Sequence, residues 1–243
     1  MSNINSKYGE EFVSGNLMGP NSLKLIEELS AHLDIRSGMR VLDLGCGKGL
    51  TSIFLADNYD VTVYATDLWI PASENYERFK NKKLDGKIIP IHAEARALPY
   101  ADEYFDLIVS VDAYHYFGTD ELYLSEVLSR FAKKGGQIAI AVPGFKEEFT
   151  DGIPEYLRQF CAENDLLTFH SNIWWKNLWS KTRCVEVIKN FDLQCSDEAW
   201  QDWLSSNNPV AKGDIEFYAA VRENFTTPAV IAKKDDLIIQ YPM

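Results

Sequence analysis

Short apolar runs alternate with longer amphipathic segments through the first 142 residues of the chain. The runs are rich in Val and Ile and are bounded by Gly, Pro or Asp, a pattern typical of buried strands. They cover residues 40–44, 61–66, 87–91, 105–111 and 137–142. Segments with helical spacing precede the first run and lie between several of the others, at residues 21–33, 50–57, 72–82 and 120–132. The alternation predicts a mostly parallel sheet with helices on both faces.

The regular alternation stops after Pro143 and Gly144. Residues 145–203 hold eleven aromatic side chains, among them five of the six tryptophans of the chain. The pattern then predicts strands at 185–188 and 229–232 and helices at 197–205 and 214–224, which return the chain to the sheet. We therefore expect seven strands in all, with a helical, aromatic-rich cap inserted after the fifth.

Composition places this chain among ordinary globular proteins. It has 243 residues, of which 46% are hydrophobic and 25% charged, so disordered and fibrous classes are excluded. Acidic residues (36) outnumber basic ones (24), and the net charge of -12 disfavours a nucleic-acid partner. No apolar stretch has the length of a membrane span and no targeting signal opens the chain, so we expect no membrane partner and a cytoplasmic location. The four cysteines form no Cys-x-x-Cys pair or Cys/His cluster, and no metal site is predicted.

The first predicted strand runs directly into a glycine-rich turn, with the sequence VLDLGCGKG at residues 41–49, and then into a helix. This arrangement brings a nucleotide-type ligand against bare backbone at a helix N-terminus. It departs from the dinucleotide fingerprint, because Leu50 stands where the third glycine would be and Asp43 would meet a pyrophosphate. A cationic ligand suits Asp43 better, and S-adenosylmethionine carries a sulfonium and an ammonium group but no phosphate.

The turn resembles the first motif of the Rossmann-like (class I) S-adenosylmethionine-dependent methyltransferases, an acidic residue followed by x-G-x-G-x-G. Asp43, Gly45, Gly47 and Gly49 match that motif position by position. The resemblance implies that Asp43 contacts the amino group of the methionine part, often through water. It also implies that the three glycines let this part approach the backbone.

The second predicted strand ends at Asp67, which corresponds to the acidic position that holds the ribose diol in this family. By the same resemblance, Leu68 and Trp69 would cover the adenine, although Trp69 suits a plain surface or core role equally well. As an isolated feature, an Asp at a strand end is more often only a cap. Its distance from the glycine turn favours the ribose role.

A third match covers residues 92–106, HAEARALPYADEYFD, which resemble the family's G-D-A-x-x-L-P-F-x-D-x-x-F-D stretch. Glu94 stands where the family usually has the Asp that accepts from the adenine amino group. Because Glu94 has the longer side chain, the backbone of Ala95 is the other candidate partner of the adenine.

The fourth predicted strand leads into Asp112 and the sequence AYHYF, at the carboxyl edge of the sheet. His115 has a suitable pKa for a general base and is the candidate catalytic residue, with a structural histidine as the alternative. Asp112 either contacts the cofactor or closes the strand. Tyr114 and Tyr116 are candidate pocket residues, one of which is expected to pack on the sheet.

Two further segments are candidates for the substrate side. Trp175 and Trp179 share a helical face, so Trp175 either lines the substrate pocket or belongs to the core. Residues 145–203 are also acidic, and an acidic, aromatic lobe could hold an amine through cation–π contacts. Tyr8 and residues 14–20 are expected to fold over the cofactor as a lid, with a disordered tail as the alternative for residues 1–7.

Together these features predict one domain with a Rossmann-like α/β fold. Its parts are residues 1–38 as lid and first helix, 39–143 as S-adenosylmethionine-binding core, 144–182 as substrate cap and 183–243 as the return to the sheet. The predicted activity is methyl transfer from S-adenosylmethionine to a small-molecule acceptor, with an amine as one candidate. The alternatives are a nicotinamide-dependent oxidoreductase and a non-catalytic S-adenosylmethionine-binding protein. The oligomeric state is not predicted.

Overall fold

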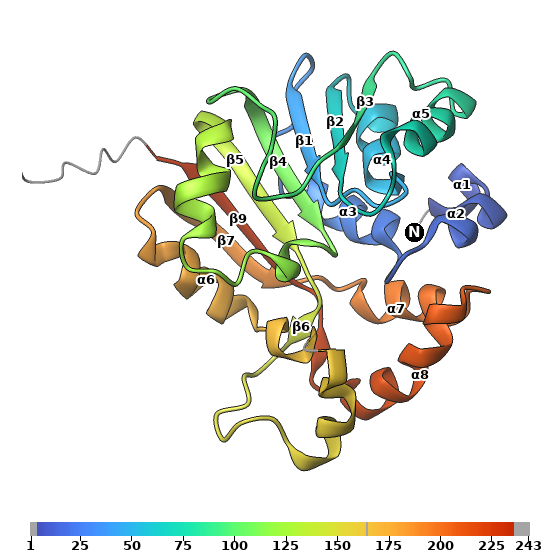
Figure 1. Cartoon of the computed structure of the whole chain (residues 1–243), viewed down its shortest axis with the longest axis vertical. Coiled ribbons are helices and arrows are strands. Elements are labelled where there is room, and N and C mark those ends of the chain that lie inside the picture. The colour runs from blue at the N-terminus through green and yellow to red at the C-terminus, as the bar shows by residue number, and fades with distance from the viewer. Residues whose placement is uncertain (1–3, 164, 236–243) are drawn as a thin grey trace, which may run out of the picture.

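A seven-stranded sheet forms the centre of the molecule (Figure 1). The computed structural model describes residues 4–163 and 165–235. In sheet order the strands are β3 (Ile88–His92), β2 (Thr62–Asp67), β1 (Arg40–Leu44), β4 (Phe105–Val111), β5 (Ala132–Ala141), β9 (Pro228–Lys234) and β7 (Val185–Asp192). All neighbouring pairs are parallel except the two made by β9, which runs antiparallel to β5 and β7. The predicted seven-stranded, mostly parallel Rossmann-like sheet is confirmed.

The central strands are mostly apolar on both sides because both faces of the sheet are covered. In β1, Val41 packs into the core on one face and Leu42 into the core on the other, and both are fully buried. Parallel strands buried on both faces read as continuous apolar runs, which is why they could be located from the sequence.

Helices cover the sheet on both faces. The helices are α1 (Ile4–Tyr8), α2 (Glu10–Asn16), α3 (Ser22–Ser30), α4 (Leu50–Asn58), α5 (Ala72–Asn81), α6 (Asn172–Lys181), α7 (Ser196–Leu204) and α8 (Pro209–Val221). Buried side chains of α3, α4 and α7 belong to one core, and those of α6 and Tyr123–Leu128 belong to the other. Within the described residues, no helix is both long enough and apolar enough to cross a membrane.

Three segments differ from the sequence-based expectations. Residues 120–132 form a π-helical turn (Tyr123–Leu128) and a 3₁₀ turn (Ser129–Phe131) in place of an α-helix. The N-terminal residues from Ile4 onward form α1 and α2, which were not expected; residues 1–3 lie outside the described residues. The helix expected at 214–224 begins at Pro209, because Asn208 caps it and proline suits the first helical turn.

The segment expected to be a cap divides into two parts. Residues 144–163 and 165–171 lie beyond the carboxyl ends of the strands, at the bottom of Figure 1, and include a short strand β6 (Gly144–Phe145) paired with β8 (Phe225–Thr226). They also contain 3₁₀ turns at Glu155–Glu163 and Asp165–Thr168. The remaining part forms α6, which packs against β7 and β9. Helix α6 therefore covers a face of the sheet and is not part of a cap.

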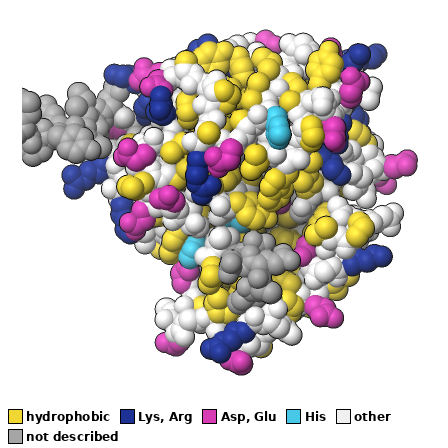
Figure 2. Space-filling view, in the orientation of Figure 1, with side chains coloured by type: hydrophobic (Ala, Val, Ile, Leu, Met, Phe, Trp, Pro, Cys, Tyr) yellow, Lys and Arg dark blue, Asp and Glu magenta, His cyan; other side chains and the backbone are white. Residues whose placement is uncertain are grey.

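Charged side chains of both signs are interspersed on the face seen in Figure 2, and hydrophobic side chains gather towards its middle. The excess of acidic residues therefore forms no single acidic patch on this face.

Candidate active site

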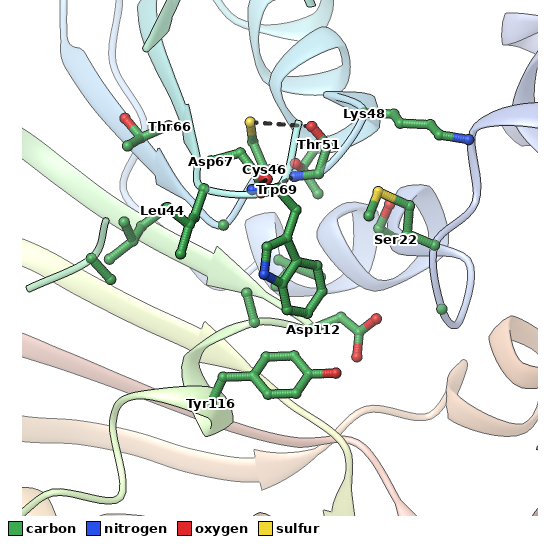
Figure 3. A pocket seen from close by; sticks show the side chains of 18 of the residues that line it. Ser22, Leu44, Cys46, Lys48, Thr51, Thr66, Asp67, Trp69, Asp112 and Tyr116 are labelled. Carbon is green, nitrogen blue, oxygen red and sulfur yellow. Dashed lines mark hydrogen bonds between the residues drawn. The ribbon is translucent and has the colours of Figure 1, made fainter. Parts of the chain in front are cut away.

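A cavity of about 260 Å³ lies at the carboxyl ends of β1, β2 and β4 (Figure 3). Its walls come from five segments of the chain. They lie within residues 16–22, 44–51, 66–69, 93–96 and 111–117. Each of the three sequence motifs supplies one of these segments, so the fold brings the motifs together around one cavity.

The glycine turn is held in a conformation that only glycine adopts easily. Gly45 and Gly49 have φ values of +75° and +80°, and Gly47 has +53°. A methyl group at Gly45 would lie 2.3 Å from Cβ of Ala113, and one at Gly49 would lie 2.4 Å from the ring of Phe79. These contacts leave no room for a side chain at Gly45 or Gly49.

Asp43 lies behind the cavity wall. Its Oδ2 accepts hydrogen bonds from the hydroxyl groups of Thr51 and Ser52, both at 2.5 Å, and its Oδ1 has no partner among the described residues. Burial raises the pKa of Asp43 to about 6. Thr51 lines the cavity and Asp43 does not, so the contact predicted for Asp43 needs an intermediary such as Thr51 or water.

Asp67 lines the cavity and connects two of its walls. Its Oδ2 accepts from the backbone N–H of Gly47 at 2.8 Å. Its Oδ1 accepts from the backbone N–H groups of Trp69 and Ile70, at 2.7 and 2.9 Å. A carboxylate offers about four lone-pair sites, so one remains for a further donor such as a hydroxyl. The position is compatible with the predicted ribose contact.

Leu68, Glu94 and Ala95 also line the cavity, on the side that the resemblance assigns to adenine. Glu94 forms an ion pair with Arg96 at 3.3 Å. The carbonyl of Ala95 accepts a hydrogen bond from the hydroxyl of Tyr123 at 3.0 Å, which fixes this loop against the core.

A second and wider cavity, of about 1080 Å³, adjoins the first. Its aromatic walls include Phe160, Phe169, Trp200, Trp203 and Phe217. The two cavities share Met18, Gly19, Pro20, Lys48, Trp69, Asp112 and Tyr116. Figure 3 shows Trp69, Asp112 and Tyr116 converging on one side of the first cavity, where these residues border the second.

Asp112 occupies the junction between the cavities with strained backbone. Its φ is +56°, which is uncommon for a residue with a side chain. Burial raises its pKa to about 8, and the charge of Asp214 on α8 adds to this effect. A methyl group at Gly19 would lie 2.1 Å from Oδ2 of Asp112, so the N-terminal segment passes directly over this carboxylate.

His115 lines the second cavity and is 1% exposed. Burial lowers the pKa of its imidazole to about 3, so the ring is neutral at physiological pH. Tyr116 lines both cavities, and its ring meets that of Trp69 edge-on with 5.3 Å between the centroids.

Three of the predicted pocket residues lie elsewhere. Tyr114 and Trp175 are fully buried in the core under α6, with 5.6 Å between their ring centroids, and they line neither cavity. The two side chains lie away from the cavities because α6 packs against the sheet. The hydroxyl of Tyr8 donates to Asp57 at 3.0 Å and accepts from Asn58 at 2.8 Å, which holds Tyr8 against α4 outside both cavities.

Comparison with known proteins identifies the core. Residues 42–140 match the family described as "Methyltransferase domain". The chain contains a methyltransferase domain. This match agrees with the class I methyltransferase resemblance of the three motifs, and it gives no support to the oxidoreductase alternative. The cofactor of this family is S-adenosylmethionine.

The curated relatives and the solved structures that resemble this methyltransferase domain are named for different acceptors. The 27-O-demethylrifamycin SV methyltransferase of Amycolatopsis mediterranei (strain S699) is 28% identical over 121 residues, which are 48% of this chain and 43% of that protein. The chain spans about half the length of the first curated relatives that it matches, at 43% and 50%.

Two solved structures resemble most of the fold. A geranyl diphosphate C-methyltransferase from Streptomyces coelicolor A3(2) has a TM-score of 0.71 at 18% identity, covering 88% of this chain and 77% of its own. Phosphoethanolamine N-methyltransferase 2 from Haemonchus contortus has a TM-score of 0.71 at 16% identity, covering 94% and 57%. At these identities the likeness is one of fold, and it leaves the acceptor of this methyltransferase domain open.

Residues that the sequence reasoning missed also shape the site. Asn75 of α5 is buried and donates to the carbonyl of Gly47 at 2.9 Å. Lys48 donates to the carbonyl of Gly15 at 3.1 Å and so ties the N-terminal segment to the glycine turn. Asn75 shares the buried face of an amphipathic helix with Phe79, and a polar residue on such a face is the signal that could have indicated it. No pattern in the sequence pointed to Asp214.

Proposed function

We propose that this protein is a methyltransferase that transfers a methyl group from S-adenosylmethionine to a small molecule. The observation that carries the proposal is the pair of adjoining cavities, one walled by the three motifs and one walled by aromatic residues. A donor and an acceptor held in two connected cavities meet where Asp112, Trp69 and Tyr116 lie, and such alignment is the main requirement of a displacement reaction.

The residues of the first cavity fit the cofactor. Asp67 has acceptor capacity left for a ribose hydroxyl, and the glycine turn brings backbone to the cavity surface. The unpartnered Oδ1 of Asp43, reached through Thr51 or water, suits the cationic methionine end. When bound, S-adenosylmethionine supplies a methyl group that its sulfonium already activates. Glu94 and the Ala95 backbone are the proposed partners of the adenine.

The protein's own residues then position the acceptor and take up its proton. With a pKa near 3, His115 is a weak base, so we assign it to the cavity wall. Asp112 lies at the junction, and its pKa of about 8 lies close to neutral pH, so its carboxyl group can bind and release a proton there. We therefore assign the removal of a proton from the acceptor to Asp112. An ammonium group beside Asp112 stabilises the ionised form of its carboxyl, so this position also favours an amine, which enters as a cation.

Turnover tests the proposal directly. The full chain is incubated with methyl-labelled S-adenosylmethionine and a panel of amines, hydroxylated compounds and carbon acids, and transfer of label is measured. We expect label in at least one amine. Binding of the cofactor without transfer to any acceptor would instead favour the non-catalytic alternative. The cytoplasmic location and the absence of nucleic-acid binding remain predictions from the sequence.

A further inference from the structure

We propose that the acceptor is a bulky, largely apolar amine that binds as a cation and carries neither a phosphate nor a carboxylate group. This inference rests on the proposed function and names its substrate class. It follows from the charges, the aromatic walls and the size of the second cavity.

The charges of the second cavity favour a cation and disfavour an anion. Among the described residues that line it, Asp112 and Asp214 carry carboxylates, and Lys48 is the one lysine or arginine. The Nζ of Lys48 donates to the carbonyl of Gly15, at 3.1 Å. An acceptor with a phosphate or carboxylate group would need several charge-assisted donors, which these walls do not offer.

Asp214 lines the second cavity and not the first. It lies in α8, and its Oδ2 accepts a hydrogen bond from the indole N–H of Trp203 at 2.7 Å. Burial raises the pKa of Asp112 and the charge of Asp214 raises it further, so two ionised carboxyl groups here disfavour each other. A cation between them relieves this repulsion, whereas an anion adds to it.

Aromatic rings form a large part of the wall. Phe160, Phe169 and Phe217 line the cavity with Trp200 and Trp203, and its volume of about 1080 Å³ exceeds what a small amino acid fills. Apolar walls of this extent reward an acceptor with a hydrophobic body. Ring faces near an ammonium group add cation–π attraction.

Two neutral polar groups lie in the same wall. His115 and Trp200 are 1% and 5% exposed, and the Nδ1 of His115 and the Nε1 of Trp200 have no hydrogen-bond partner among the described residues. Burial keeps the imidazole of His115 uncharged, since it lowers the pKa to about 3. A neutral oxygen or nitrogen on the acceptor matches such groups better than an anionic group does.

Binding of matched probes tests this inference. The full chain is first saturated with S-adenosylhomocysteine, and calorimetry then measures the binding of tryptamine, tryptophan and tryptophol, which share one indole skeleton. Phosphoethanolamine is the fourth probe. We expect tryptamine to bind saturably and the other three to bind at least about tenfold more weakly.

A matched pair of variants locates the effect. Asp214→Asn removes the charge but keeps an oxygen that can accept from Trp203, and it should weaken tryptamine binding by at least about tenfold. The control, Glu216→Gln, makes the same change at an exposed position of α8 outside the cavity. It should leave all four probes unaffected.

The outcomes separate this inference from the proposed function. If tryptophan or phosphoethanolamine binds as tightly as tryptamine, or if tryptamine does not bind to the saturated protein at millimolar concentration, the inference is overturned. An Asp214→Asn variant that binds tryptamine normally also overturns it. If S-adenosylhomocysteine itself does not bind, it is the proposed function that fails.

Discussion

At the scale of single residues, two carboxylates near the glycine turn have different surroundings. Asp67 lies on the cavity wall and accepts from three backbone N–H groups, whereas Asp43 lies behind the wall and accepts from two hydroxyl groups. Burial raises the pKa of Asp43 to about 6. These surroundings predict a ligand contact for Asp67 and an indirect, electrostatic role for Asp43.

Substitution of Asp67 tests the ribose contact. Asp67→Ala should weaken the binding of S-adenosylhomocysteine by roughly 1.5–3 kcal/mol, because charged hydrogen bonds to the ligand are lost. Calorimetry gives the Kd. The Kd of Asp67→Asn, which keeps one oxygen acceptor, should lie between those of the parent protein and Asp67→Ala. An unchanged Kd in Asp67→Ala would remove this residue from the site.

Substitution of Asp43 tests the effect of its burial. Between about pH 4 and pH 6 the folded chain binds a proton at Asp43 that the unfolded chain does not, so the free energy of unfolding falls as the pH rises. Asp43→Asn lacks this loss and keeps an acceptor for Thr51 and Ser52. Relative to the parent protein, its free energy of unfolding should gain about 2 kcal/mol between about pH 4 and pH 7.

Denaturant unfolding without cofactor at the two pH values measures this difference. Asp102→Asn, on the exposed surface, is the matched control. If the free energies of unfolding of Asp43→Asn and the parent protein differ by the same amount at both pH values, the buried carboxylate has no such effect.

At the scale of elements, the strands and the glycine turn could be predicted because their signals are local. The strand β1, the turn and α4 follow one another in sequence, and buried parallel strands are mostly apolar on both sides. Helix α6 could not be assigned in this way. The spacing of Trp175 and Trp179 shows that they share a face, but not whether that face meets a cavity or the sheet.

The conformation of the turn can be tested at Gly45. Gly45→Ala combines a φ of +75° with a contact of 2.3 Å to Ala113, so the free energy of unfolding should fall by at least about 2 kcal/mol. Gly86→Ala is the control, because a methyl group there meets nothing within 4 Å. Equal stability of the two variants would contradict the packing described for the turn.

Helix α6 gives a test that separates core from cavity. Trp175→Ala should lower the free energy of unfolding by roughly 3–5 kcal/mol, because a fully buried indole is removed. Below its melting temperature the variant should bind S-adenosylhomocysteine with the Kd of the parent protein. A higher Kd with an unchanged free energy of unfolding would instead indicate that Trp175 lines the pocket.

At the scale of the whole molecule, the cofactor side of the site could be predicted from the sequence and the acceptor side could not. The cofactor motifs lie within a single family match at residues 42–140. The second cavity draws on the N-terminal segment, on helices α7 and α8, and on Gln159, Phe160, Leu166 and Phe169, which meet only through tertiary packing. Asp112 and Asp214 illustrate this, because neither residue by itself indicates that the other is near.

Calorimetric titration of the full chain with S-adenosylhomocysteine tests the central claim most directly, since it needs no knowledge of the acceptor. The structure predicts saturable binding at one site per chain, which Asp67→Ala weakens and Trp175→Ala leaves unchanged. The absence of binding at millimolar ligand, or binding that Asp67→Ala does not alter, would contradict the account.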